Sequence, residues 1–176
     1  MAHILYVIAK NGFRDEEYFI PREVLEAAGH AIVTASNGEA GVVAVGSHGG
    51  EARIDATIAD MKAAAFDAVV FAGGPGAAEN LDNEESYRLI RETVATGKLL
   101  GAMCIAPTIL AKAGVLRGKK ATVWSSPLDQ DPIAILENNG AEYIDAPVVE
   151  DSNIITANGP KTAHAFGEAL VARLHF

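Results

Sequence analysis

The single cysteine of this 176-residue chain, Cys104, stands where a nucleophile would be expected. It follows the apolar run LLGAM and precedes the helix-like segment IAPTILAKA. A sharp strand-to-helix turn exposes its side chain at the edge of a sheet. The helix dipole there favours a thiolate, and the unpaired backbone N–H of Ile105 could stabilise an oxyanion. The competing interpretation is a small thiol packed in the core.

A glycine-rich segment, Gly73-Gly74-Pro75-Gly76, follows the apolar run DAVVFA. Glycines let the backbone approach other groups closely, so Gly74 could supply a second oxyanion N–H beside Cys104. Alternatively, the segment is only a turn that needs positive φ angles. The GxxxxGK[ST] spacing of a phosphate-binding loop is absent, which disfavours that role.

Two adjacent carboxylates, Glu16 and Glu17, follow the first apolar run at the expected start of a helix. Carboxylates in this position stabilise a helix by complementing its dipole. One that pointed toward Cys104 would be desolvated, and its pKa would be raised. It could then hydrogen-bond to the thiolate or move a proton. Helical phasing does not choose between the two neighbours.

The elements that must position these residues alternate along the chain. Apolar runs predict buried strands, and periodic segments that end at glycine predict helices. Strands are expected at 3–9, 31–36, 67–72, 99–103 and 121–124, with two short ones near 148–150 and 154–156. Helices are expected at 15–28 (kinked or broken at Pro21), 59–65, 84–96, 105–113, 132–139 and 162–174. Residues 38–58 predict short antiparallel strands or a hairpin.

This alternation predicts an α/β protein with a mostly parallel sheet and helices on both faces. No repeat or linker divides the sequence, so we expect one domain over residues 1–176. Sites in such sheets form at the carboxyl ends of strands. That rule selects the loop at 10–17, the glycine loop and the turn at Cys104.

The composition excludes several classes of protein. A net charge of −9 and an isoelectric point near 4.9 argue against binding to nucleic acid. No apolar run reaches the roughly 18 residues of a membrane span, and the apolar N-terminus is interpreted as a strand, not a signal peptide. One cysteine permits neither an internal disulfide nor a multi-cysteine metal site. We therefore expect a cytoplasmic protein without a metal.

Four motifs together resemble the ThiJ/PfpI superfamily: NGFRDEEYFIP, FAGGPGA, GAMCIAPTILAKAGVLRGKKAT and ITANGPKTA. The resemblance runs over nearly the full length of the chain. It implies a flavodoxin-like three-layer sandwich with a small antiparallel hairpin, no cofactor, and a homodimer or a higher oligomer. It also implies a nucleophilic Cys104, a partner carboxyl at Glu17, and oxyanion donors at the backbone of Gly74 and Ile105.

The sequence departs from this family at three positions. Peptidase-like members have histidine directly after the cysteine, where this chain has Ile105. The deglycase-like branch has a histidine where Ser126 stands, two residues after Trp124, and an arginine where Asn158 stands. Ser126, Trp124 and Asn158, together with Gly73, are therefore the candidates for the residues of a pocket.

None of the five histidines falls on a catalytic position of the family. His48, in the glycine-rich segment, could reach a site in a partner subunit. His164, near the start of the last helix, is a weaker candidate.

Three functions follow from the resemblance. The first is a glyoxalase or deglycase, in which Cys104 attacks methylglyoxal, glyoxal or their adducts and Glu17 moves protons to give lactate or glycolate. The second is an intracellular cysteine peptidase or amidase, which lacks its adjacent histidine here. The third is a redox sensor, in which peroxide oxidises Cys104 to a sulfinic acid beside Glu17.

Overall fold

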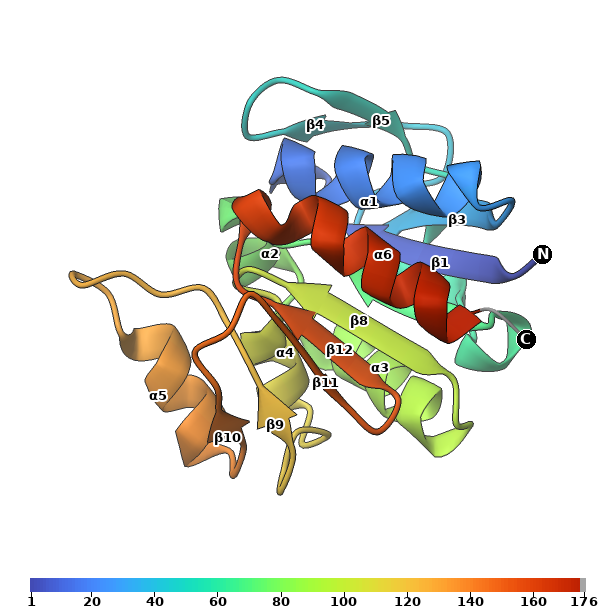
Figure 1. Cartoon of the computed structure of the whole chain (residues 1–176). Coiled ribbons are helices and arrows are strands. Elements are labelled where there is room, and N and C mark those ends of the chain that lie inside the picture. Colours follow the sequence, from blue (N-terminus) through green and yellow to red (C-terminus); the bar gives the residue numbers. More distant parts are fainter. Residues whose placement is uncertain (175–176) are drawn as a thin grey trace.

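A seven-stranded sheet lies at the centre of the computed structural model, which describes residues 1–174 (Figure 1). Its strand order is β11-β12-β8-β7-β1-β3-β6. The strands are β1 (His3–Ile8), β3 (Ala31–Ser36), β6 (Ala56–Thr57), β7 (Ala68–Phe71), β8 (Leu99–Met103), β11 (Val148–Asp151) and β12 (Ile154–Ala157). All neighbours pair in parallel except β11 with β12. The predicted, mostly parallel α/β architecture is confirmed.

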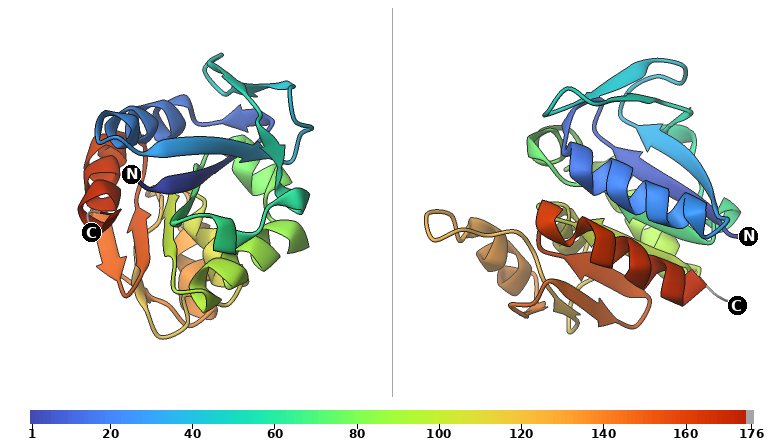
Figure 2. Two further views of the ribbon diagram at one scale, coloured as in Figure 1. Left: turned by 90° about the vertical axis from the view of Figure 1, so that its right-hand side faces the viewer. Right: turned by 45° about the horizontal axis from the view of Figure 1, so that its top comes forward.

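Helices cover both faces of this sheet. On one face α1 (Asp15–Ala27) and α6 (Ala163–Leu174) pack side by side, as the two views of Figure 2 also show. The other face is covered by α3 (Glu84–Ala95) and α4 (Pro107–Lys112), with α5 (Asp131–Asn138) against α4. A short helix, α2 (Pro75–Asn80), follows β7.

The central strand β1 shows why the apolar runs are nearly continuous. Side chains alternate between the two faces of a strand. Tyr6 and Ile8 lie in the hydrophobic cluster that contains Phe166 of α6, and Leu5 and Val7 lie in the cluster on the α3 side. Because both faces are covered, every residue after the first is buried.

The helix α1 passes through Pro21 without interruption, so of the two outcomes predicted there, a kink or a break, the break does not occur. A proline removes the N–H that would bind the carbonyl four residues earlier, here that of Glu17. The hydroxyl of Tyr6 donates to this carbonyl oxygen at 2.6 Å. This buried hydrogen bond satisfies the carbonyl, and it also ties Glu17 to the central strand.

The glycine-rich segment forms the antiparallel pair β4 (Val43–Gly46) and β5 (Glu51–Arg53), as predicted. An unpredicted strand, β2 (Asn11–Phe13), pairs with β4 in parallel. The helix expected at 59–65 is instead two 3₁₀ turns, Ile58–Asp60 and Ala63–Ala65.

The strand expected at 121–124 is shortened to β9 (Lys120–Ala121), which pairs with β10 (Glu142–Tyr143) outside the main sheet. The backbone beyond β9 finds other partners. The N–H of Thr122 donates to the hydroxyl of Thr156, and the N–H of Trp124 donates to the carbonyl of Cys104. The second bond places this loop beside the cysteine.

Candidate active site

Cys104 occupies a strained turn between β8 and α4. Its φ angle is 60°, in the left-handed region, which costs a residue other than glycine about 1–3 kcal/mol. Its N–H donates to the carbonyl of Ala157 at 2.9 Å, and its carbonyl accepts from Trp124 at 2.8 Å. The helix begins at Pro107, two residues later than predicted, so a short turn separates it from Cys104. The neighbouring strand and loop hold the strained backbone in place.

Glu17 projects from the first turn of α1 and is fully buried. Its Oε2 accepts a hydrogen bond from the N–H of Gly73 at 2.8 Å. Its Oε1 has no hydrogen-bond partner among residues 1–174. The carboxyl lies in the same pocket as the thiol of Cys104, and its charge raises the pKa of that thiol. The neighbouring Glu16 is partly exposed and pairs with Arg14, so the fold selects Glu17 as the partner of the thiol.

Gly73 leaves room for this contact. A Cβ atom added at Gly73 would lie 2.6 Å from Oε2 of Glu17 and 2.7 Å from Cβ of Cys104. Real Cβ atoms essentially never show contacts this short. Any larger residue would therefore push the carboxyl and the cysteine apart.

Burial raises the pKa of Glu17 to about 7, although Cys104 and the hydrogen bond from Gly73 act in the opposite direction. Burial also raises the pKa of the Cys104 thiol, and the charge of Glu17 adds to the effect. The sequence-based expectation that the helix dipole favours a resting thiolate is therefore wrong, because burial and the nearby carboxylate oppose it. The thiol keeps its proton at rest and has a carboxylate within reach to accept it.

The backbone N–H groups of Gly74 and Ile105 both lower the pKa of Cys104, but by less than burial raises it. Gly74 has a φ angle of 106°, and a Cβ atom there would lie 2.4 Å from the backbone nitrogen of Arg14. The two donors therefore act on the sulfur from two different loops. Such convergence is what an oxyanion site requires.

A pocket of about 350 Å³ opens above the cysteine. It is lined by Arg14, Glu17, Gly74, Pro75, Ala78, Cys104, Ile105, Trp124 and Pro160. The structure thus brings together five of the residues that the sequence singles out, namely Cys104, Glu17, Gly74, Ile105 and Trp124.

Three pocket candidates lie outside this lining. Gly73 is buried behind it, against the carboxyl of Glu17. Ser126 closes a local turn, where its hydroxyl accepts from the N–H of Asp129 at 3.1 Å. Asn158 donates its N–H to the carbonyl of Pro147. Ser126 and Asn158 are therefore not among the residues that line this pocket, and turns next to the strands hold both of them.

Arg14 is a charged residue of the pocket that the sequence patterns do not single out. It precedes Glu17 by three residues, a spacing that brings two side chains to one side of a helical turn. This spacing in the segment RDEE is the signal that could have identified it.

The two candidate histidines lie on the surface. Nδ1 of His48 is 3.5 Å from Oε1 of Glu16, and Nδ1 of His164 is 3.6 Å from Oε2 of Glu168. Neither lines the pocket of Cys104. The described chain, residues 1–174, contains no group of three His, Cys, Asp or Glu side chains that could hold a metal ion.

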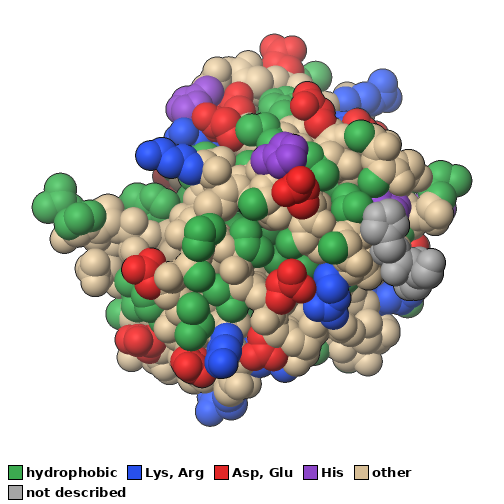
Figure 3. Space-filling view, in the orientation of Figure 1, with side chains coloured by type: hydrophobic (Ala, Val, Ile, Leu, Met, Phe, Trp, Pro, Cys, Tyr) green, Lys and Arg blue, Asp and Glu red, His purple; other side chains and the backbone are tan. Residues whose placement is uncertain are grey.

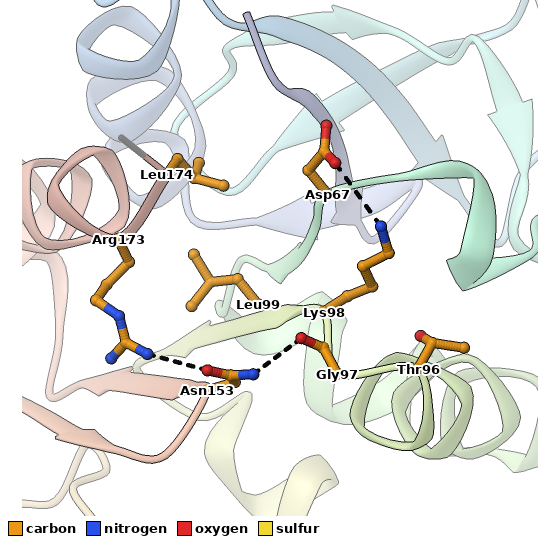
Figure 4. A pocket seen from close by; sticks show the side chains of 8 residues that line it. All are labelled: Asp67, Thr96, Gly97, Lys98, Leu99, Asn153, Arg173 and Leu174. Carbon is orange, nitrogen blue, oxygen red and sulfur yellow. Dashed lines mark hydrogen bonds and ion pairs between the residues drawn. The ribbon is translucent and has the colours of Figure 1, made fainter. Parts of the chain in front are cut away.

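A second pocket, of about 360 Å³, adjoins the opposite ends of the strands (Figure 4). Its polar side chains already have partners. Nζ of Lys98 lies 3.8 Å from Oδ1 of Asp67, and Asn153 connects the guanidinium of Arg173 to the carbonyl of Gly97. The lining contains no cysteine, serine or histidine.

The surface carries charges of both signs. On the face in Figure 3, acidic and basic side chains are interspersed. None of the helices within residues 1–174 combines the length and the apolar character needed to cross a bilayer.

Comparison with known proteins agrees with this fold. The model of the DJ-1/PfpI family matches residues 2–173. A deglycase of Pyrococcus horikoshii is 33% identical over 171 residues, which cover 97% of this chain and 98% of the relative. A ThiJ/PfpI domain protein of Brachyspira murdochii superposes with a TM-score of 0.90 at 30% identity, over 98% of this chain and 95% of its own. The chain belongs to the DJ-1/PfpI family.

A further relative is named for a different activity. A Bacillus subtilis protein, provisionally named as a cysteine protease, is 33% identical over 166 residues, or 94% of this chain and 95% of the relative. Relatives of this chain are thus named for two activities.

Proposed function

We propose that the protein is a cofactor-free enzyme that converts 2-oxoaldehydes such as methylglyoxal, and their adducts, into 2-hydroxy acids. One observation carries this proposal: the Cys104 thiol shares a pocket with a buried carboxyl, Glu17, whose pKa is about 7. A general base is most effective when its pKa lies near the working pH. The deglycase name of the Pyrococcus relative points the same way.

The first step is the addition of the thiol to the aldehyde. Glu17 accepts the thiol proton while the sulfur of Cys104 forms a bond to the aldehyde carbon. The carbonyl π electrons move to oxygen, and the N–H groups of Gly74 and Ile105 stabilise the developing oxyanion. Glu17 then returns the proton to this oxygen, which gives a hemithioacetal and restores the carboxylate. An aminocarbinol adduct reaches the same intermediate when the thiol displaces its amine.

The second step moves hydrogen within the substrate. Glu17 removes the proton from the former aldehyde carbon, and an enediol forms with the neighbouring ketone. Return of a proton to the second carbon gives a thioester of the 2-hydroxy acid. Water then hydrolyses the thioester and releases Cys104. The aldehyde carbon is oxidised and the ketone carbon reduced, so one water is the only co-reactant.

Peptide hydrolysis makes a demand that this site does not meet. It needs a group that protonates the leaving amine, which a histidine supplies in cysteine and serine peptidases. Ile105 follows the nucleophile here, and no histidine lines the described pocket. Addition to a free aldehyde expels no amine, so it requires only the thiol, the carboxyl and the two N–H donors.

The test is formation of lactate from methylglyoxal by the reduced protein. We expect turnover in the wild type and none in Cys104→Ala, with Arg22→Gln as a matched surface variant that keeps full activity. Absence of lactate from folded, reduced wild-type protein would reject the proposal. Peptide cleavage that depends on Cys104 would support the peptidase instead. Sulfinic acid at low peroxide without turnover would support the redox sensor.

The proposal also places the enzyme in the cytoplasm. A nucleophilic cysteine without a disulfide partner is kept reduced in that compartment.

A further inference from the structure

Arg14 is the only cationic side chain that lines the pocket among the described residues. We infer that Arg14 binds an anionic group of the ligand, so that the enzyme selects reactive carbonyl compounds that carry a carboxylate. This inference rests on the proposed function and specifies its substrate class. It concerns a residue outside the thiol–carboxyl pair and its oxyanion donors.

The backbone places Arg14 at the edge of the reaction centre. Its N–H donates to the carbonyl of Gly73 at 3.0 Å, and its carbonyl accepts from the N–H of Glu17 at 3.1 Å. Arg14 is therefore bonded to both segments that position the carboxyl. The guanidinium also lowers the pKa of Glu17, so its positive charge acts on the site.

The guanidinium keeps donors for a ligand. Nε donates to Oε2 of Glu16 at 2.8 Å, and Nη2 donates to Oε1 at 3.3 Å. A guanidinium has five N–H donors in a planar fork that matches a carboxylate. Three of the five, including both on Nη1, have no acceptor in the described part of the chain. A ligand carboxylate can bind there while the pair with Glu16 persists.

Glu16 competes with a ligand for the positive charge of Arg14. It also lies 3.5 Å from Nδ1 of His48, so its carboxylate contacts a second side chain besides Arg14. Its carboxylate does not line the pocket, whereas Arg14 does. The remaining walls include Trp124 and Ile105, which suit a short carbon chain between the carbonyl and the carboxylate.

Two alkylating reagents test the inference without any turnover. Iodoacetate and iodoacetamide both form a sulfur–carbon bond to Cys104 with loss of iodide, but only iodoacetate is charged. The measured quantity is the rate with iodoacetate divided by the rate with iodoacetamide. This ratio cancels changes in the reactivity of the thiol itself. We expect this ratio to fall about threefold or more in Arg14→Gln. An unchanged ratio in folded Arg14→Gln would overturn the inference.

A second variant protects the test against misfolding of the first. Glu16→Gln removes the competitor and should raise the same ratio about threefold. Arg22→Gln, on the same helix but paired with Glu26, should leave the ratio at the wild-type value. If Arg14→Gln does not fold, an unchanged ratio in Glu16→Gln overturns the inference.

A pair of aldehydes then separates the inference from the proposed function. 4,5-Dioxopentanoate and 2-oxopentanal share the reacting dicarbonyl and differ in a terminal carboxylate against a methyl group. We expect kcat/KM to favour the acid in the wild type, and Arg14→Gln to lose this preference mainly through KM. Equal turnover of both aldehydes would overturn the inference and leave the proposed function intact. Turnover of neither aldehyde, with an alkylation ratio that depends on Arg14, would reject the proposed function and support the anion site.

Discussion

The pockets at the two ends of the central strands have similar volumes, about 350 and 360 Å³, yet they differ in how their polar groups are satisfied. At the carboxyl ends, Glu17 is fully buried with an oxygen that lacks any nitrogen or oxygen partner among the described residues. At the amino ends, Lys98 and Asp67 pair with each other and are each about one-third exposed. In the first pocket, burial disfavours the charged form of a carboxyl, and it raises the pKa of that carboxyl.

The backbone differs in the same way. Cys104 holds a left-handed conformation that is rare for residues other than glycine, whereas the positive φ angle in the second pocket belongs to a glycine, Gly97. Strain and buried, poorly paired groups reduce stability, and they persist where the surrounding structure enforces them. The comparison indicates that chemistry belongs to the first pocket, and four predictions test it.

Loss of the nucleophile should have the largest effect. Cys104→Ala should reduce lactate formation by about 10³-fold or more, because no other nucleophile lines the pocket. The initial rate with methylglyoxal measures the effect. The matched change in the second pocket, Lys98→Met, should leave this rate within about twofold. A large loss in Lys98→Met would break the distinction between the two pockets.

Removal of the buried carboxyl should have the second-largest effect. Glu17→Gln should lower kcat about 10²- to 10⁴-fold, because the thiol loses its base. The wild-type rate should rise with pH through about 7, as Glu17 ionises. A pH profile of kcat/KM for wild type and variant measures both effects. A profile that is flat between about pH 6 and 8 would contradict this role for Glu17.

The same residue should make stability depend on pH. Folding raises the pKa of Glu17 from 4.5 to about 7, so the folded state binds more protons between these values. The stabilisation is present at low pH and is lost as the pH rises through about 7. Between about pH 4 and 8 the wild type should lose ~3 kcal/mol of unfolding free energy relative to Glu17→Gln. Urea unfolding of both proteins across this range measures the difference, and parallel curves would contradict it.

The smallest effects come from comparing Gly73, which lies beside the first pocket, with Gly97, which lines the second. Gly73→Ala should destabilise the protein by about 1–3 kcal/mol and impair activity, since the new methyl group must displace Glu17 or Cys104. Gly97→Ala has open space around the new methyl group but a φ angle of 68°, so it should cost about 1 kcal/mol and leave activity intact. Thermal unfolding and the lactate assay measure both. Equal loss of activity in the two variants would contradict the steric role of Gly73.

The sequence by itself predicts the architecture, because apolar runs and glycine stops are local signals. The strand at 31–36 and the strand at 99–103 have the predicted bounds, and the antiparallel pair in the glycine-rich segment is present. The strand expected at 121–124 is shortened to β9 in the structure, and the reason is not local. Its neighbours, Thr122 and Trp124, form hydrogen bonds to residues distant in the sequence, and no local pattern reports those partners.

The features of the site also divide into those that the sequence predicts and those that only the tertiary structure decides. The sequence locates Cys104 at its turn and narrows its partner to Glu16 or Glu17, but only the resemblance to a known family favours Glu17. The tertiary structure decides the question, because the hydroxyl of Tyr6 binds the carbonyl of Glu17 while Gly73 binds its carboxyl. It also decides the protonation state of the thiol, since burial is a property of the packed fold. Arg14 enters the pocket for the same reason: the folded loops, and not its own type, bring it beside the cysteine.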